Sequence, residues 1–295
     1  MDIKRKPDWF RKKFAGTSEL GLVIRTLDDL NLHTVCEEAK CPNRNECYAA
    51  GQATFLIMGD VCSRNCNFCA IAHGKPQPLD PDEPSRIAQA AKKMALSYIV
   101  ITSVTRDDLP DYGAGHFAGT IGAIKALLPE SGVEALTPDF LGNHKALEKV
   151  FCEKPDVFNH NVETIPELYS KVRPQADYHR SLDVLRYAAR ESDSIIKSGF
   201  MVGLGETKER VFDLLKELSN ASIDVVTIGQ YLQPSPAHLP IDRFVHPDEF
   251  AEYADFGERE LGFKKVFSGP LVRSSFMAKE IWKKCLHESV VKQKD

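Results

Sequence analysis

The sequence predicts an α/β protein built on a partial (β/α)6 TIM-type barrel. Beyond residue 50, short β-rich runs alternate with amphipathic helical stretches. A repeating strand–helix unit of about 30–40 residues indicates parallel strands with helices outside the sheet. Six units are fewer than the eight of a closed barrel, which favours an open, partial one. The predicted strands are residues 54–58, 98–102, 133–136, 157–161, 195–202 and 225–228.

Helices are predicted between these strands and after the last one, at residues 85–96, 117–127, 143–151, 181–191, 207–218 and 246–261. The stretch 207–218 shows the periodicity best. One face of this helix is apolar and carries Val211, Leu214, Leu215 and Leu218. The opposite face is charged and carries Lys208, Glu209, Lys216 and Glu217. The Pro-rich stretch QPSPAHLP predicts a loop.

Three parts are expected along the chain: an extension over 1–50, the barrel over 51–270, and a C-terminal extension over 271–295. The first part has three cysteines and little β pattern, so we expect it to need a bound group for order. A metal cluster would provide this, because its binding free energy becomes folding free energy. The tail after about residue 279 is charged, and we expect it to be loosely held.

Composition excludes several classes of protein. The 295 residues are 43% hydrophobic, which suffices for a substantial core, and the net charge of −4 predicts neither nucleic-acid nor membrane binding. No apolar run approaches the roughly 18–20 residues that span a bilayer. The basic start, MDIKRKPDWFRKKF, lacks the apolar centre of a secretory signal and predicts a solvated arm or a contact with an acidic partner. Eight cysteines are too few for a disulfide scaffold, so we expect a cytoplasmic metalloprotein. We expect a monomer, because no exposed apolar stripe calls for burial by a second copy.

The first cysteine triplet is Cys62, Cys66 and Cys69, spaced C-x3-C-x2-C directly after the first predicted strand. Three thiolates hold a cubane [4Fe–4S] cluster but leave one iron open to a small molecule. Structural zinc sites prefer four ligands, and typical ferredoxin runs supply four cysteines. The loop also follows the C-terminal end of a strand, where barrel enzymes place their chemistry.

The second triplet is Cys36, Cys41 and Cys47, spaced C-x4-C-x5-C. This spacing is too wide for a zinc knuckle, and the first cluster needs only its own three ligands, so a second, auxiliary cluster is favoured. Its fourth ligand is left open by the spacing. Cys152 and Cys285 are the remaining cysteines, and each is more often an ordinary residue than a ligand in such surroundings.

The first triplet resembles the signature of the radical S-adenosylmethionine superfamily, including an aromatic residue, Phe68, before the last cysteine. Further motifs follow in order: VITSVTRDDLPDYGAGHF, LTPDFLG, FNHNVET, VRPQADYHRSL, GFMVGLGET, TIGQYLQPSPAHLP and SGPLVRSSF. Together with both triplets they resemble the lipoyl synthase family over residues 7–278.

The resemblance implies the reaction and its cofactors. Two [4Fe–4S] clusters and two molecules of S-adenosylmethionine would convert an octanoyl group, amide-linked to a lysine of a carrier domain, into a lipoyl group by inserting sulfur at C6 and C8. The first cluster would bind the amino and carboxylate groups of S-adenosylmethionine and generate a 5′-deoxyadenosyl radical. The auxiliary cluster would donate the sulfur.

The resemblance also implies partners. These are lipoyl-carrier domains of 2-oxoacid dehydrogenase E2 subunits and glycine cleavage H protein, an electron donor such as flavodoxin or ferredoxin, and an iron–sulfur carrier that rebuilds the auxiliary cluster. No nucleic acid or membrane is expected.

In the family, an Arg-Ser-Ser-Tyr motif supplies the fourth ligand of the auxiliary cluster. Here the segment reads RSSF, so the resemblance places this ligand at Ser275. Phe276 replaces the family tyrosine and removes one hydroxyl. The resemblance thus makes Cys62, Cys66, Cys69 and Ser275 the expected catalytic residues.

Other contacts to S-adenosylmethionine are expected at the C-terminal ends of the strands. The candidates are Thr102, Ser103, Asn161, Glu163, Arg173, Gly203 and Gly205. Glu163 would accept a hydrogen bond from the amino group or ribose, and Asn161 and Arg173 would bind the carboxylate. The glycines would allow close backbone approach. We expect His73, His116, His160 and His179 to be hydrogen-bonding loop residues rather than metal ligands.

Three other functions compete with this interpretation. A two-cluster electron carrier would close its clusters with four cysteines and would not need a barrel. A methylthiotransferase would be expected to carry an additional RNA-binding β-barrel at its C-terminus, which about 30 tail residues cannot form. A biotin-synthase-like enzyme would not carry the N-terminal triplet and the RSSF segment at these places.

Overall fold

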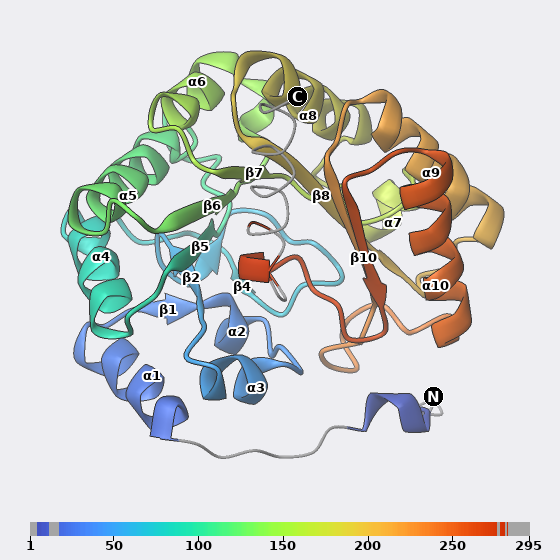
Figure 1. The fold of residues 1–295 in the computed structure, drawn as a ribbon, viewed down its shortest axis with the longest axis horizontal. Coiled ribbons are helices and arrows are strands. Elements are labelled where there is room, and N and C mark those ends of the chain that lie inside the picture. The colour runs from blue at the N-terminus through green and yellow to red at the C-terminus, as the bar shows by residue number, and fades with distance from the viewer. Residues whose placement is uncertain (1–4, 12–17, 276–277, 281, 283–295) are drawn as a thin grey trace, which may run out of the picture.

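A computed structural model of the chain describes residues 5–11, 18–275, 278–280 and 282. Within them, one eight-stranded sheet has the order β1-β2-β5-β6-β7-β8-β9-β10. The strands from β2 to β10 pair in parallel, and β1 pairs antiparallel with β2. The sheet curves into a crescent with its helices on the convex side (Figure 1). The predicted partial barrel is confirmed.

All six predicted strands are present, as β2, β5, β6, β7, β8 and β9. The sequence did not predict β1 and β10, which form the two edges of the sheet. β10 therefore adds a seventh parallel strand. The bounds are β1 His33–Thr34, β2 Thr54–Ile57, β5 Tyr98–Ser103, β6 Gly132–Leu136, β7 Val157–Asn159, β8 Ile195–Val202, β9 Val225–Gln230 and β10 Lys265–Gly269. A separate two-stranded parallel sheet pairs β3 Val61–Cys62 with β4 Ala72–His73.

The predicted helices are also present, within a few residues of their expected bounds. They are α4 Glu83–Lys93, α5 Ala114–Leu127, α6 His144–Cys152, α8 Tyr178–Glu191, α9 Lys208–Asn220 and α10 Pro247–Asp255. Shorter turns are η1 Asp8–Phe10, η2 Phe140–Gly142, η3 Pro166–Leu168, α7 Tyr169–Val172 and η4 Phe256–Glu260. The side chains of Asn143, Asp177 and Thr207 each accept a hydrogen bond from the first turn of a helix, which fixes the starts of α6, α8 and α9.

The core lies between the convex face of the sheet and the helices. Phe55, Ile101, Phe158 and Phe200 reach it from alternate positions of their strands. The four apolar residues predicted for one face of α9 are all buried there. The opposite, concave face carries the buried pair of Glu134 and Lys197 beside the apolar side chains of Tyr98 and Val100.

The described residues before β2 form α1 Ser18–Asp29, α2 Val35–Glu38 and α3 Arg44–Ala49 besides η1 and β1. The expectation that a bound group orders this extension stays a prediction. Val23, Leu27 and Tyr48 are buried in the main core, so apolar packing and a strand pairing both attach this extension to the barrel. In Figure 1 these helices lie beside β2, at one end of the crescent.

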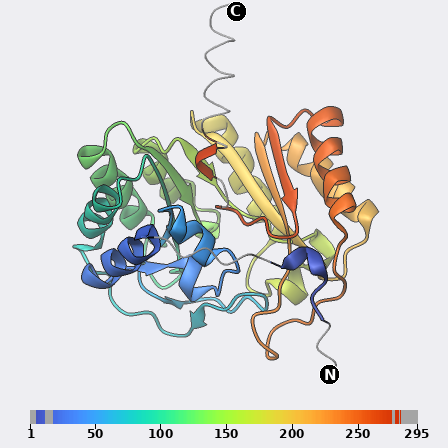
Figure 2. The same cartoon turned by 60° about the horizontal axis from the view of Figure 1, so that its bottom comes forward.

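The chain after β10 returns across the concave face of the sheet (Figures 1 and 2). Ala278 and Trp282 pack there on Tyr98 and Val100 of β5, with the rings of Trp282 and Tyr98 5.4 Å apart. The rest of the tail predicted to be loosely held lies outside the described residues.

Candidate functional site

The first triplet lies on the loop that follows β2, as predicted. Cys62 ends the short strand β3, and its sulfur accepts hydrogen bonds from the backbone N–H groups of Arg64 (3.4 Å) and Thr105 (3.3 Å). These two donors hold the sulfur in place on the loop. Cys66 and Cys69 follow within the same loop, and both lie close enough to Cys62 for its charge to raise their pKa values.

Arg64, between the first two cysteines, anchors this loop to the barrel. Its guanidinium is 3% exposed and donates to Asp107 (2.6 Å) and to Asp139 (2.7 Å). Burial alone would raise the pKa of Asp139, but the hydrogen bond and charge of Arg64 outweigh it and hold that pKa well below its usual range. A buried ion pair therefore fixes the backbone that presents the sulfurs.

The Pro-rich loop predicted from QPSPAHLP covers the other end of the triplet. His238 donates from Nε2 to the carbonyl oxygen of Cys69 (2.9 Å), and its Nδ1 lies 2.8 Å from the hydroxyl of Ser235. A carbonyl only accepts, so the proton is on Nε2 and Ser235 donates to Nδ1. The backbone N–H of Leu239 also donates to the carbonyl of Asn67 (3.2 Å).

The protonation of the sulfurs in the first triplet depends on whether iron is bound. Burial raises the pKa of Cys69 to about 12 and also raises that of Cys66, which the neighbouring Arg173 partly opposes. Neutral thiols are thus favoured without a metal, whereas bound iron deprotonates a thiol outright. The donor set fits a [4Fe–4S] cluster, whose remaining iron would stay open.

A polar group of side chains lies beside Cys66. Arg173 donates to the backbone oxygen of Asn161 (3.0 Å), and Asn161 donates from Nδ2 to Glu163 (3.1 Å). Burial raises the pKa of Glu163, and Arg173 opposes this shift. Among the described residues, the buried atoms Asn161 Oδ1 and Arg173 Nε have no hydrogen-bond partner. The group thus offers one acceptor, one cationic donor and one carboxylate to a zwitterion.

The other predicted contacts to S-adenosylmethionine have different surroundings. The hydroxyl of Ser103 is buried without a partner in the described structure, but that of Thr102 donates to the carbonyl of Leu136 (3.0 Å). Gly203 has φ +93°, and a Cβ there would lie 2.0 Å from Nε2 of Gln230. The glycine is therefore needed for packing against β9. Around Gly205, no atom lies within 4 Å of such a Cβ. Their roles in ligand binding stay predictions.

Phe68 makes apolar contacts outside its own loop. It packs against Val172, Leu204 and Tyr231, which form a small apolar cluster below the triplet. This contact holds the loop to the segments that follow β7, β8 and β9.

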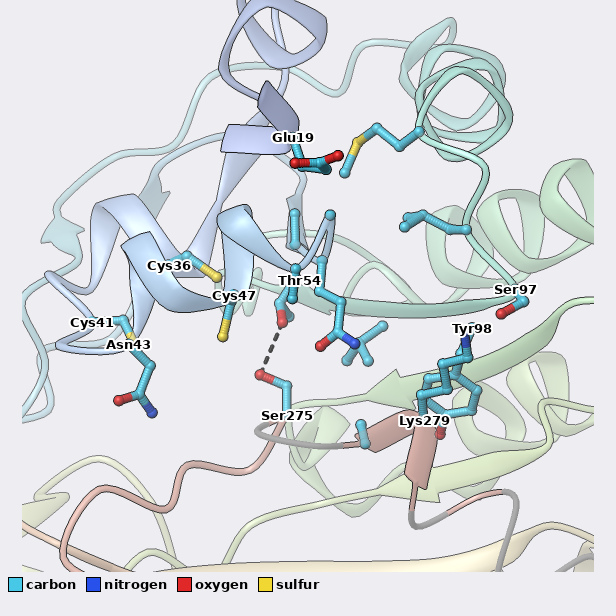
Figure 3. A pocket seen from close by; sticks show the side chains of 18 of the residues that line it. Glu19, Cys36, Cys41, Asn43, Cys47, Thr54, Ser97, Tyr98, Ser275 and Lys279 are labelled. Atoms are coloured by element: carbon cyan, nitrogen blue, oxygen red, sulfur yellow. Dashed lines mark hydrogen bonds between the residues drawn. The ribbon is translucent and has the colours of Figure 1, made fainter. Parts of the chain in front are cut away.

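The second triplet lines a pocket at the opposite end of β2 from the first (Figure 3). Cys36 lies in α2 and Cys47 in α3, with Cys41 between the two helices. Ser275 lines the same pocket, and its Oγ lies 2.8 Å from the hydroxyl of Thr54, the first residue of β2. The two segments that the sequence could only associate by resemblance are therefore neighbours.

Positive charge lies beside these sulfurs. Arg273 is half-buried; desolvation lowers its pKa, and the charge of Cys41 opposes that effect. Burial raises the pKa of Cys36 to about 11, and hydrogen bonds from Thr54 oppose it. Three thiols, one hydroxyl and a half-buried guanidinium fit an anionic cluster with a serine ligand.

The structure describes only one of the two remaining cysteines that were considered as ligands of the auxiliary cluster. Cys152 is exposed at the end of α6, whereas Cys285 and Phe276 lie outside the described residues. In the described part of the chain, no three His, Cys, Asp or Glu side chains are arranged around a single metal ion. A cubane is larger than one ion, so its ligands lie farther apart.

The four histidines named in the sequence have different surroundings. His160 is buried and hydrogen-bonded to the carbonyl of Thr137 (2.9 Å), and burial lowers its pKa to about 4. His116 pairs with Glu83 (2.6 Å), while His73 and His179 are exposed. None lines the pocket of the second triplet.

Four residues of the two sites were missed by reasoning from the sequence: Arg64, His238, Thr54 and Ser274. The position of Arg64 inside the first motif was the only available signal. The other three act through partners more than a hundred residues away, which no local pattern reveals.

A cysteine triplet on the loop after the first strand of an open parallel barrel, beside a polar group suited to a zwitterion, defines a radical S-adenosylmethionine enzyme. The family model of the Radical SAM superfamily matches residues 56–218. Lipoyl synthase of Caldicellulosiruptor saccharolyticus is 54% identical over 95% of this chain and 98% of its own. Lipoyl synthase of Pelobacter propionicus is 54% identical over 92% and 87%. The chain belongs to the lipoyl synthase family.

Solved structures support the fold alone. HydG, a maturase of the [FeFe]-hydrogenase, aligns with a TM-score of 0.59 at 14% identity, over 85% of this chain and 63% of its own. Streptococcus suis SuiB bound to S-adenosylmethionine aligns with a TM-score of 0.54 at 14% identity, over 67% and 44%. Within the described residues, no helix has the length and apolar character needed to cross a membrane.

Proposed function

We propose that this enzyme inserts two sulfur atoms, at C6 and C8, into an octanoyl group amide-linked to a lysine of a lipoyl-carrier domain. One observation carries the proposal. Cys36, Cys41, Cys47 and Ser275 line one pocket, although the serine lies more than two hundred residues after the cysteines. The fourth ligand expected from the family motif is thus beside the other three.

In this proposal the protein holds two [4Fe–4S] clusters with different roles. Cys62, Cys66 and Cys69 would hold the one that binds S-adenosylmethionine, and the pocket of the second triplet would hold the one that supplies sulfur. A hard serine oxygen is a labile ligand for soft iron, which suits a cluster that must be dismantled in each turnover. Rebuilding then requires an iron–sulfur carrier protein.

The polar group beside Cys66 would orient S-adenosylmethionine. Arg173 has a free buried N–H for the carboxylate of the ligand, and Glu163 suits its ammonium. Asn161 offers its oxygen, because its nitrogen is already engaged by Glu163 and Ser274. It therefore suits an ammonium or hydroxyl group better than the carboxylate expected from the sequence. Bound S-adenosylmethionine supplies the 5′-deoxyadenosyl radical, strong enough to abstract hydrogen from an unactivated C–H bond, twice per lipoyl group.

The proposal includes partners and assembly. The carrier would be an E2 subunit of a 2-oxoacid dehydrogenase or the H protein of glycine cleavage, and electrons would come from flavodoxin or ferredoxin. We propose a monomer, since only a few large apolar side chains are exposed on the described surface, and they are scattered.

Mass spectrometry of an octanoylated carrier peptide tests the proposal. The anaerobic, reduced enzyme with S-adenosylmethionine should add two sulfur atoms to the peptide. Ser275→Ala should still produce 5′-deoxyadenosine but transfer little sulfur, while Cys152→Ala, which removes an exposed cysteine, should behave as wild type. An unchanged octanoyl mass after several equivalents of reductant would reject the proposed reaction. No 5′-deoxyadenosine at all would favour an electron carrier.

A further inference from the structure

The segment 271–275 is held tightly on the concave face of the sheet. The side chain of Asn43, from the loop between α2 and α3, donates to the carbonyl of Leu271 (2.7 Å). The carbonyl oxygen of Val272 lies 2.3 Å from the position that a Cβ on Gly229 would take, so only glycine fits at this point of β9. The segment therefore has little freedom to shift as a rigid piece.

The two serines of this segment contact different sites. Ser275 lies against Thr54 in the pocket of the second triplet (Figure 3). Ser274 accepts a hydrogen bond of 2.6 Å from Nδ2 of Asn161, which belongs to the polar group beside Cys66. Two consecutive residues thus connect the two cysteine sites through one peptide bond.

The contacts of Asn161 fix which way its amide faces. Nδ2 lies near both Ser274 and a carboxylate oxygen of Glu163. An ionised carboxylate only accepts, so the nitrogen must be on this side. Oδ1 is then on the opposite side of the amide, where it is buried and has no hydrogen-bond partner among the described residues. Ser274 is therefore one of two groups that fix the direction of this oxygen, which lies over Gly199 of β8.

We propose that Ser274 is a positioning residue that couples the site for S-adenosylmethionine to Ser275. By holding the amide of Asn161, it orients an acceptor for the ligand, and the same bond restrains the neighbouring Ser275 in the pocket of the second triplet. The inference rests on the proposed function, which supplies the occupants of both sites. Coupling of this kind is reciprocal: the seating of Ser275 strengthens binding of S-adenosylmethionine, and binding of the ligand restrains Ser275.

Binding of radiolabelled S-adenosylmethionine to the anaerobic, reconstituted, unreduced enzyme tests the first half by equilibrium dialysis. Ser274→Ala should raise the dissociation constant about three- to tenfold, the usual effect of one lost hydrogen bond. Ser274→Thr keeps the hydroxyl and should restore the wild-type value. Ser268→Ala is the matched control, because that hydroxyl is buried in β10 without a hydrogen-bond partner in the described structure.

A double-mutant cycle tests the coupling. Ser275→Ala should weaken binding by itself, but it should have no further effect in the Ser274→Ala background. Effects that simply multiply would show that each serine acts locally, and they would overturn the inference. If Ser274→Ala fails to take up iron, Asn161→Leu removes the same bond from the other side, and Ser275→Ala should then be without effect on binding in that background.

The outcome also separates this inference from the proposed function. A wild-type enzyme that does not bind S-adenosylmethionine or make 5′-deoxyadenosine would reject both. A wild-type enzyme that makes lipoyl product, with Ser274→Ala binding the ligand as tightly as wild type, would reject only the role of Ser274.

Discussion

Single side chains decide how the sulfurs are presented. Thr54 is 5% exposed, and its hydroxyl lies between Ser275 Oγ and Cys36, contacting one ligand from each end of the chain. Arg64 has the corresponding position under the first triplet, where two aspartates hold it. Neither residue supplies a sulfur, yet each fixes residues that do.

Thr54→Val keeps the shape of the side chain and removes the hydroxyl. We expect faster loss of iron from the second site, because Ser275 loses the partner that holds it, while formation of 5′-deoxyadenosine continues. Chelator-accessible iron, followed spectroscopically in wild type, Thr54→Val and Thr54→Ser, measures this. Equal rates in all three proteins would show that the hydroxyl does not position Ser275.

Arg64→Met leaves the buried Asp139 without its main countercharge. The free energy of unfolding should fall by about 3–5 kcal/mol, since breaking a buried pair strands a charge. Chemical denaturation measures the loss, with Arg186→Met as the control. Arg186 and Asp183 form an exposed pair on α8, and breaking it should cost no more than about 1 kcal/mol. A similar small loss for both variants would contradict the anchoring role of Arg64.

At the scale of elements, the site of the first triplet is formed by loops that follow the C-terminal ends of strands. The loop after β9 contacts the first triplet through His238. The last residue of α7, Val172, accepts a hydrogen bond at its carbonyl from the backbone N–H of Asn67 in the loop of the triplet (3.0 Å). Both segments follow the C-terminal ends of parallel strands, which meet at one edge of the sheet. The triplet is therefore enclosed by parts of the chain that lie far apart in sequence.

His238→Ala removes the hydrogen bond to the carbonyl of Cys69. We expect reduced formation of 5′-deoxyadenosine and less iron in the first site, because the last ligand of the loop is less well held. His179→Ala, which changes an exposed histidine on α8, should have no effect on either quantity. Full iron content and activity in His238→Ala would show that the loop after β9 is dispensable for the triplet.

At the scale of the whole molecule, β2 separates the two triplets. One triplet precedes the strand and the other follows it. The segment 271–275 lies on the concave face and contacts both sites (Figure 1). An open sheet makes this possible, since a closed barrel fills its interior with side chains from its own strands. Here the segment 271–275 fills part of that space.

Independent removal of each triplet should separate the two roles. Wild type should hold about eight irons per chain, two clusters of four. Cys36→Ala should keep about half and still cleave S-adenosylmethionine, whereas Cys62→Ala should keep about half and cleave none. Iron analysis and assay of 5′-deoxyadenosine measure both. Loss of all iron in either variant would show that the sites are not independent.

The sequence by itself determined the repeating strands and helices and the two triplets. Period, cap residues and cysteine spacing are local, so 207–218 and Cys62, Cys66 and Cys69 could be identified without a structure. The role of Ser275 came from resemblance, and RSSF alone would have been passed over as a surface loop.

Only the tertiary structure decided what lies across the sheet. β1 and β10 are defined by their pairing with neighbouring strands, and the described N-terminal helices pack on the barrel through Val23, Leu27 and Tyr48. The bonds of Thr54 to Ser275 and of Asn161 to Ser274 join residues 221 and 113 positions apart. Such contacts depend on how the whole chain packs, so local periodicity in the sequence does not predict them.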